Sequence, residues 1–356
     1  MSLFNDILAA DQTLFKDDTI LDFDYIPTIV SGRDDEIKGI VESVKPLFFD
    51  KAPTNLFITG LPGIGKTLAL KFVFNDLKQT SSDIIPCYIN CWKNSTYHSV
   101  FVELSKFFGV PYPSKGVSTD EIIRGITKKI ENKKGIVVAF DEIDKARTMD
   151  FLYPLIDGFG RKICLLLVSN YNNFLSKVDS RLLSRLNIEN LDFKPYNRPQ
   201  FENILKERVD YAFYPNVFEK DAFNTVVDKA CTKKDVRLGI SLLLKSGRRA
   251  ESESSKKVKK EHVDFAIKNI EESLQKDRMK DLEDHEKKIL DLLKGENGII
   301  TGDLYDKFVK TGENISMRTF RKYLNQLERS EFINTEDTGA GFRGKSRKIY
   351  LKNYGS

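Results

Sequence analysis

The segment from Gly60 to Thr67, which reads Gly-Leu-Pro-Gly-Ile-Gly-Lys-Thr, constrains the fold of this chain more than any other feature. It directly follows an apolar run typical of a buried strand and precedes a segment with helical periodicity. Glycines at this spacing let backbone N–H groups turn inward around a phosphate, while the lysine reaches the β- and γ-phosphates and the threonine ligates Mg²⁺. The sequence therefore predicts a P-loop that binds ATP or ADP. The residues expected at this loop are Gly60, Leu61, Pro62, Gly63, Ile64, Gly65, Lys66, Thr67 and Leu68.

Residues 55–195 alternate short apolar runs with helical patterns. Because each run is almost continuously apolar, it suits a parallel sheet that is covered on both faces. We therefore expect an α/β fold, a doubly wound parallel sheet of the P-loop NTPase type, in a nucleotide-binding domain over residues 1–195. The expected strands are Asn55–Thr59, Ile84–Asn90, Gly135–Phe140, Ile163–Ser169 and Ile188–Phe193.

After Pro195 the pattern turns helical, which predicts an all-helical lid over residues 196–272. The lysine-rich stretch Ser252–Lys260 is expected to be a surface turn between helices. Residues 271–286 are highly charged with few apolar positions, so we interpret them as a linker or an exposed helix end.

Residues 273–356 are expected to form a winged helix-turn-helix. Two short amphipathic helices, Glu286–Leu293 and Asp303–Val309, precede a third helix that Ser316 caps and that ends at Arg329. Thr301 is the expected cap of the second helix. Two strands, Phe332–Thr335 and Arg347–Leu351, then flank a glycine-rich turn.

The excess positive charge is concentrated at this end of the chain. The net charge of the chain is +5, and residues 315–356 alone hold nine Lys or Arg against four acidic residues. The rest of the chain is therefore neutral on balance. A basic segment attached to a neutral remainder is typical of a module that binds a polyanion such as DNA.

The third helix of this segment predicts a DNA-contacting face. Phe320, Leu324 and Leu327 recur at helical spacing and are expected to face the core. The polar positions between them would enter a major groove, and the cations of the wing would follow the phosphate backbone. The alternative is a winged helix that contacts protein. The candidate DNA-binding residues are Arg318, Thr319, Arg321, Lys322, Asn325, Arg343, Lys345 and Arg347.

A second apolar run, Ile136–Phe140, ends in two carboxylates. The run would deliver Asp141 and Glu142 to the carboxyl end of a strand, where ligands of parallel sheets bind. We expect Asp141 to hold Mg²⁺ together with Thr67, and Glu142 to polarise the attacking water as general base.

Further polar residues complete the expected ATPase site. Asn170 follows a buried strand and could orient the attacking water, although asparagine also favours turns. Arg237 begins a lid helix and could reach the phosphates, or could simply be solvated. Arg185, with Arg181 in reserve, could serve the ATP of a neighbouring subunit as an arginine finger, or could form a surface ion pair. Because a finger supplies about 10³–10⁵ in rate, an isolated subunit should hydrolyse ATP slowly.

Cysteine usage and hydropathy indicate the compartment. The four cysteines show no metal-binding spacing, so we expect reduced thiols. The first residues lack the basic start and the long apolar run of a signal peptide, so we expect none, and the most apolar segment, Ile163–Val168, is too short to span a bilayer. We expect a cytoplasmic, nucleoid-associated protein without membrane contact.

Taken together, these motifs resemble the AAA+ ATPases, and among them the archaeal replication initiators related to origin recognition complex and cell division control proteins. Tyr25-Ile26-Pro27 and the segment from Ile29 to Glu36 resemble the family's box before the P-loop, and Asp141 to Asp144 resembles its Walker B motif. Pro111–Ile122 resembles its insertion zone. The resemblance implies that Ile29, Val30 and Arg33 contact the adenine. The chain departs from the family's Gly-Asp-Ala-Arg at the lid, because Lys234 and Val236 flank Asp235 here.

The resemblance, which covers Leu14 to Tyr350, implies a function. The leading hypothesis is an ATP-regulated initiator that recognises double-stranded origin DNA and helps recruit a replicative helicase of the minichromosome maintenance type. Self-association on DNA and slow hydrolysis as a switch would accompany it. The alternatives are a transcriptional or plasmid-encoded regulator with the same domains, and a catalytic motor or clamp loader.

Overall fold

The computed structural model of the chain describes residues 13–280, 282–294, 297–313, 315–330, 332–337 and 347–352. The chain forms two compact units, and the boundary between them lies between Val263 and Asp264. This boundary falls inside helix α11 (Lys260–Lys280). The helix is continuous through residues 271–280, so the charged stretch begins as the exposed end of a helix rather than as an irregular linker.

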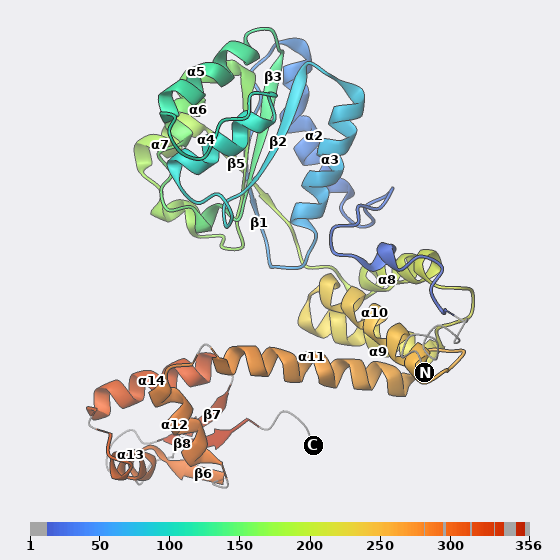
Figure 1. Ribbon diagram of the computed structural model, residues 1–356, viewed down its shortest axis with the longest axis vertical. Helices are drawn as coiled ribbons and strands as arrows, with labels where there is room; N and C mark the ends of the chain where they lie inside the picture. Colours follow the sequence, from blue (N-terminus) through green and yellow to red (C-terminus); the bar gives the residue numbers. More distant parts are fainter. Residues whose placement is uncertain are drawn as a thin grey trace, which may run out of the picture. The chain divides into compact units, whose positions relative to one another are not determined.

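A five-stranded parallel sheet organises the first unit (Figure 1). The strands lie in the order β2-β3-β4-β1-β5, which places β1 between β4 and β5. Both faces of β3 and β4 are buried, which explains their continuous apolar sequence. All five strands predicted from the sequence are confirmed, with ends that differ by at most one residue. The strands are β1 (Asn55–Thr59), β2 (Ile84–Asn90), β3 (Gly135–Asp141), β4 (Ile163–Val168) and β5 (Ile188–Asp192).

Helices cover both faces of the sheet (Figure 1). One face carries α2 (Asp34–Val44) and α3 (Lys66–Thr80), and the last two residues of the P-loop form the start of α3. The other face carries α4 (Tyr97–Lys106), α5 (Thr119–Ile130), α6 (Leu152–Phe159) and α7 (Ser180–Leu186). Short 3-10 helices are η1 (Asp18–Leu21), η2 (Lys45–Phe49), η3 (Ile143–Lys145), η4 (Gly160–Lys162) and η5 (Phe174–Lys177).

Three helices form the predicted lid, and the first begins at a capping box made by Asn197 and Gln200. The predicted surface turn is confirmed between the last lid helix and α11. It is held at Val258, which is fully buried and whose N–H donates to the carbonyl of Val217 at 2.8 Å. The lysines on either side of Val258 are exposed. The lid helices are α8 (Arg198–Ala212), α9 (Lys220–Lys233) and α10 (Val236–Ser252).

The second unit has the element order of a winged helix. Phe308 and Phe320 pack at its centre with ring centroids 5.3 Å apart. Its antiparallel sheet has the order β6-β8-β7, and the sequence missed β6 because that strand has four residues and no strong alternation. The elements are α12 (Asp284–Leu293), β6 (Asn297–Ile300), α13 (Thr301–Lys310), α14 (Met317–Arg329), β7 (Ile333–Asp337) and β8 (Arg347–Leu351).

One of the two predicted helix caps in this unit is confirmed. The Ser316 hydroxyl accepts a hydrogen bond from the N–H of Thr319 at 3.2 Å, at the start of α14. The prediction for Thr301 is wrong, because α13 begins at this residue and Ile300 precedes it as the cap. The Thr301 hydroxyl instead donates to the carbonyl of Arg347 at 3.0 Å, which ties the helix to β8.

The cysteines are free thiols, as predicted, and three of the four are buried. Burial raises the pKa of Cys91 and Cys164 to about 12, so both thiols stay protonated. Within the described ranges, no helix combines the length and the apolar character needed to cross a membrane.

Replacing the cap of α14 should weaken the second unit. Ser316→Ala is expected to lower the local free energy of unfolding by about 1 kcal/mol, because the N-cap hydrogen bond is lost. Hydrogen–deuterium exchange of the α14 amides measures this change. Ser330→Ala, at the other end of the same helix, is the matched control and should cost less than about 0.5 kcal/mol. Equal losses in both variants would contradict the assignment.

Candidate nucleotide-binding site

The P-loop joins β1 to α3, and its backbone path admits only glycine at two positions. Gly60 has a φ of 144°, and a Cβ atom there would lie 2.5 Å from the carbonyl oxygen of Phe193. Gly63 has a φ of 75°, and its Cβ would lie 2.1 Å from a carboxylate oxygen of Asp235. Both positions therefore combine a left-handed backbone with close neighbours. This path turns the loop around the space in front of the α3 N-terminus, where backbone N–H groups favour an anion.

The ammonium group of Lys66 lies inside this loop. It donates to the carbonyls of Gly60 and Leu61 at 2.7 and 2.8 Å, and to Oδ1 of Asn170 at 2.7 Å. Burial lowers the pKa of Lys66 to about 8, against the opposing effect of Asp141. Asn170 therefore lies beside the lysine of the P-loop.

Asp141 is buried at the end of β3, and one of its carboxylate oxygens accepts hydrogen bonds from two hydroxyl groups. Its Oδ2 accepts from Oγ1 of Thr67 at 2.6 Å and from the hydroxyl of Tyr88 at 2.7 Å. Burial, with the nearby Asp141 charge, raises the pKa of Tyr88, so the phenol remains a donor. The expected pair of Thr67 and Asp141 is thus brought together. These hard oxygen donors suit Mg²⁺, which prefers such ligands.

Glu142 has a left-handed backbone with a φ of 54° and lines the cavity described below. Nδ2 of Asn90 donates to Oε2 of Glu142 at 3.4 Å. Neither Asn90 nor Tyr88 was predicted from the sequence as a site residue. The one feature that could have identified them is the parallel pairing of β2 with β3, in which Asn90 lies opposite Asp141.

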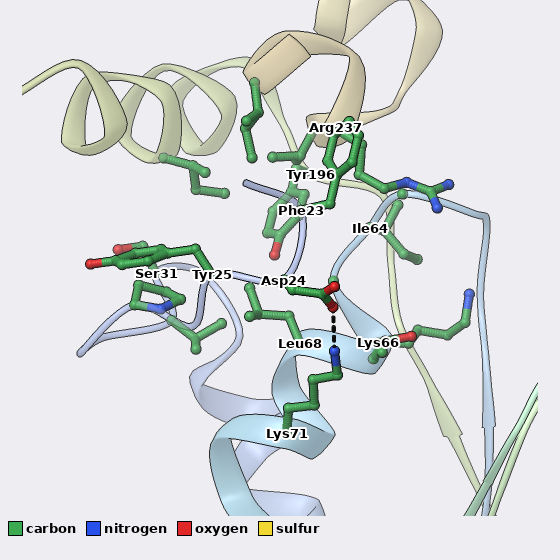
Figure 2. Close-up of a pocket in the computed structure, with 18 of the residues that line it drawn as sticks. Phe23, Asp24, Tyr25, Ser31, Ile64, Lys66, Leu68, Lys71, Tyr196 and Arg237 are labelled. Atoms are coloured by element: carbon green, nitrogen blue, oxygen red, sulfur yellow. Dashed lines mark hydrogen bonds and ion pairs between the residues drawn. The ribbon is translucent and has the colours of Figure 1, made fainter. Parts of the chain in front are cut away.

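A cavity of about 320 Å³ extends from the P-loop to the lid (Figure 2). This volume falls in the range of small-molecule sites. Figure 2 shows Lys66 on one side of the cavity and Tyr25 with Ser31 on the other. Predicted residues that line it are Ile29, Val30, Pro62, Gly63, Ile64, Gly65, Lys66, Thr67, Leu68, Asp141, Glu142, Asn170 and Arg237. Lining residues that the sequence did not single out include Phe23, Asp24, Lys71, Tyr196, Ile204, Glu207 and Arg208.

Arg33 does not line the cavity, and this corrects its expected role. Its side chain is buried, and Nη2 donates to the carbonyls of Ile64 and Lys194, each at 2.8 Å. The guanidinium also lies 3.8 Å from the ring centroid of Tyr196 and pairs with Glu36. These contacts hold the guanidinium against the backbone of the P-loop and outside the cavity wall. Gly60 and Leu61 also lie outside the cavity wall and hold Lys66 through their carbonyls.

The lid meets the P-loop through the start of α10. The N–H of Val236 donates to the carbonyl of Gly63 at 3.2 Å, and Asp235 caps the helix by accepting from the N–H of Arg237. Lys234 has a φ of 53°, so this lysine adopts the left-handed conformation that glycine favours. Arg237 therefore lies at the cavity despite the departure from the usual motif (Figure 2).

The two candidate finger arginines lie on α7 and do not line the cavity of their own chain. The guanidinium of Arg185 pairs with Asp157 at 2.8 Å and is half-exposed, while Arg181 is exposed. Their expected role toward a neighbouring subunit stays a prediction.

On α14 of the second unit, the predicted core face is confirmed, because Phe320, Leu324 and Leu327 are buried. Thr319 is half-buried beside the Ser316 cap. Arg318, Arg321, Lys322 and Asn325 are exposed.

Arg347 of β8 is tied to this helix rather than extended from the wing. Its Nη1 donates to Oδ1 of Asn325 at 3.4 Å, and its guanidinium lies 3.6 Å from both Glu328 and Asp337. Arg343 and Lys345 lie outside the described residues.

The parallel sheet, the P-loop with its partner carboxylates and the helical lid define an AAA+ ATPase. Two family models match the chain: an AAA domain over residues 50–174 and a Cdc6 AAA+ ATPase-type lid domain over residues 202–268. The order of these matches follows the order of the two parts in the structure.

The chain belongs to the family of ORC1-type DNA replication proteins. It is 31% identical to ORC1-type DNA replication protein 1 of Sulfurisphaera tokodaii, over 95% of this chain and 90% of that protein. It is 28% identical to ORC1-type DNA replication protein 2 of Methanosarcina acetivorans, over 98% and 96%. Among solved structures, Aeropyrum pernix ORC1 in complex with DNA matches with a TM-score of 0.76, 26% identity and coverage of 96% and 94%. The role is therefore in DNA replication, and a transcriptional or plasmid-encoded regulator is not favoured.

Proton uptake should accompany nucleotide binding at pH 8. The pKa of Lys66 is lowered to about 8, and the negative charge of a polyphosphate would raise it again. Isothermal titration of magnesium-saturated ATP, in buffers of different ionisation enthalpy, should therefore give an uptake of about half a proton at pH 8 and much less at pH 6.5. Buffer-independent heats at pH 8 would contradict this.

The same shift predicts how stability depends on pH. The charged form of Lys66 costs folding free energy, because its pKa lies below the ordinary 10.5. This cost is present in full below pH 8 and is relieved as pH rises from 8 toward 10.5. Lys66→Met should remove that contribution, which denaturation of the nucleotide-free protein across this pH window measures.

Proposed function

We propose that this protein is an ATP-regulated initiator that binds double-stranded origin DNA and helps to recruit the replicative helicase. The observation that supports the proposal is that one chain contains two separate candidate sites. The first is an ATPase site closed by a lid, and the second is a helix with exposed cations on a separate unit. We retain three functional parts: nucleotide binding over residues 1–195, the lid over 196–272 and DNA binding over 273–356.

The proposed nucleotide site assigns a task to each polar group. Lys66 and Arg237 would bind phosphate oxygens, while Ile29 and Val30 would contact the adenine. Thr67 and Asp141 would hold Mg²⁺, which neutralises phosphate charge when bound. Their oxygens already lie 2.6 Å apart, so the side chains are arranged before any ligand arrives.

Glu142 is the proposed general base, and Asn170 would orient the water. The hydrogen bond from Asn90 holds the Glu142 carboxylate at the cavity wall. The candidate fingers, Arg185 and Arg181, lie on a different part of the unit from this wall. Hydrolysis in an isolated subunit would therefore be slow, and ATP would act mainly as a switch whose rate rises on self-association.

The second unit would supply the DNA contact. Exposed Arg318, Arg321, Lys322 and Asn325 on α14 are placed on the face away from the hydrophobic core, as major-groove recognition requires. Arg347 would position Asn325 through their hydrogen bond. The related Aeropyrum pernix ORC1 protein was determined in complex with DNA, which supports this assignment. We propose that Arg343 and Lys345 extend the contact along the backbone.

Action at a chromosomal origin would place the protein in the cytoplasm, associated with the nucleoid. Mapping its binding sites along the chromosome of its own cell tests the initiator role. Enrichment at one or a few replication origins is expected. Enrichment at promoters alone would overturn the proposal.

Removing the general base should separate binding from hydrolysis. Glu142→Gln is expected to lower the ATP hydrolysis rate by at least about 100-fold, because the amide cannot take a proton from water. ATP affinity should change by less than about threefold, since hydrolysis rather than binding needs the base. Radiolabelled ATP turnover and calorimetry measure the two effects. Asp150→Asn, which removes an exposed carboxylate of the same unit, should alter neither.

Removing one cation of α14 should weaken DNA binding in a salt-dependent way. Arg321→Gln is expected to reduce the slope of log affinity against log salt by about 1, as for the loss of one phosphate contact. Fluorescence anisotropy with duplex DNA at several salt concentrations measures this. Lys38→Gln removes one charge from an exposed site on α2 and is the matched control. An unchanged affinity in Arg321→Gln would count against α14 as the reading helix.

A further inference from the structure

Residues 13–25, which we call the strap, run along the lid before they reach the nucleotide cavity. Phe15 forms an antiparallel bridge with Phe213 at the end of α8, and their ring centroids lie 4.6 Å apart. The N–H of Lys16 donates to the carbonyl of Ala212 at 2.8 Å. Both aromatic rings are buried, so the start of the strap is part of the lid core.

The lid helix α10 is shaped to receive this segment. A Cβ atom on Gly247 would lie 2.5 Å from the ring of Phe15, so the ring fills the space that a side chain would need. One turn later, Oε1 of Glu251 accepts from the hydroxyl of Thr13 and the N–H of Leu14, both at 2.7 Å. The strap is therefore bound by main-chain, side-chain and packing contacts at once.

Arg208 of α8 makes a second anchor nearer to the cavity. Only 6% of the residue is exposed, and Nη1 donates to the carbonyl of Ile20 at 2.8 Å. Its guanidinium lies 4.6 Å from the centroid of the Tyr25 ring. Burying a guanidinium is costly unless it is hydrogen-bonded, so this position is specified by those two partners. Arg208 thereby fixes the backbone at Ile20 and the ring of Tyr25 together.

Beyond this anchor, Phe23, Asp24 and Tyr25 line the nucleotide cavity. Figure 2 shows an ion pair from Asp24 to Lys71 of α3, where the two atoms are 2.7 Å apart. The Asp24 side chain is 92% exposed, and such exposed pairs contribute little to stability. Buried contacts thus join the strap to the lid, whereas this exposed contact joins it to the P-loop helix.

We propose that Arg208 is a positioning residue for base selectivity: through the carbonyl of Ile20 and the ring of Tyr25, it sets Tyr25 at the end of the cavity away from Lys66. This inference rests on the proposed nucleotide site and extends it. The P-loop binds the triphosphate that all nucleotides share, so it does not distinguish bases. A wall of aromatic strap residues gains more contact area from a purine than from a pyrimidine. Arg208 and Tyr25 therefore determine selectivity for the base, although Arg208 acts through the strap.

The test compares ATP with CTP in the full-length protein. Calorimetry gives the ratio of the two dissociation constants for the wild type, Arg208→Gln and Tyr25→Leu. The wild type should prefer ATP, and each variant should reduce that preference by about tenfold, because Tyr25→Leu removes the stacking surface and Arg208→Gln releases that surface from the base end of the cavity. Arg198→Gln is the matched control, since Arg198 lies on the same helix and pairs with Asp228 on the surface. Its ratio should equal that of the wild type.

Each result of this comparison either supports the role of Arg208 in base selectivity or overturns it. A wild type that binds ATP without preference over CTP overturns the inference, as does a variant whose ratio is unchanged. Equal weakening of both nucleotides indicates a general loss of structure and also overturns the selectivity role. Tyr25→Leu keeps the test decisive where Arg208→Gln does not fold. Failure of the wild type to bind any nucleotide would instead refute the proposed ATP site.

Discussion

The path of the chain between β1 and α3 is the constraint on which the nucleotide unit depends. Gly60 passes against the carbonyl of Phe193, and Gly63 passes against Asp235 at the lid, so the loop is in contact with the end of β5 and with α10 at the same time. The same turn buries the ammonium of Lys66 among loop carbonyls. This one short segment therefore contacts the sheet and the lid. A change in the nucleotide bound to the loop would alter its contacts with both.

The chemistry gathers at one edge of the sheet because parallel strands all end there. Asn170 follows β4 and Asp141 ends β3, so their side chains meet Lys66 and Thr67 at the P-loop. The lid adds Arg237 to the wall of the cavity. This division places fixed polar groups on the rigid sheet and the closing elements on helices, which suits a switch better than a fast motor.

Sequence periodicity predicted the five strands, the lid helices and the buried face of α14 because these signals are local. The spacing of its glycines likewise predicted the P-loop, because this signal is also local. The residues whose positions differ from expectation are those that depend on distant partners. Arg33 supports the P-loop because Ile64 and Lys194 are folded beside it. Thr301 bonds a strand that follows more than 40 residues later. No local pattern could reveal either partner.

The sequence by itself determined the class of site, since glycines, lysine, threonine and paired carboxylates permit little other chemistry at these spacings. Only the tertiary structure decided what surrounds that site. Tyr88 and Asn90 reach the carboxylates through the pairing of β2 with β3. The strap reaches the cavity because Phe15 and Arg208, far apart in sequence, belong to one folded lid. Sequence motifs identify the residues expected to carry out the chemistry. Long-range packing decides which other side chains position those residues and surround the ligand.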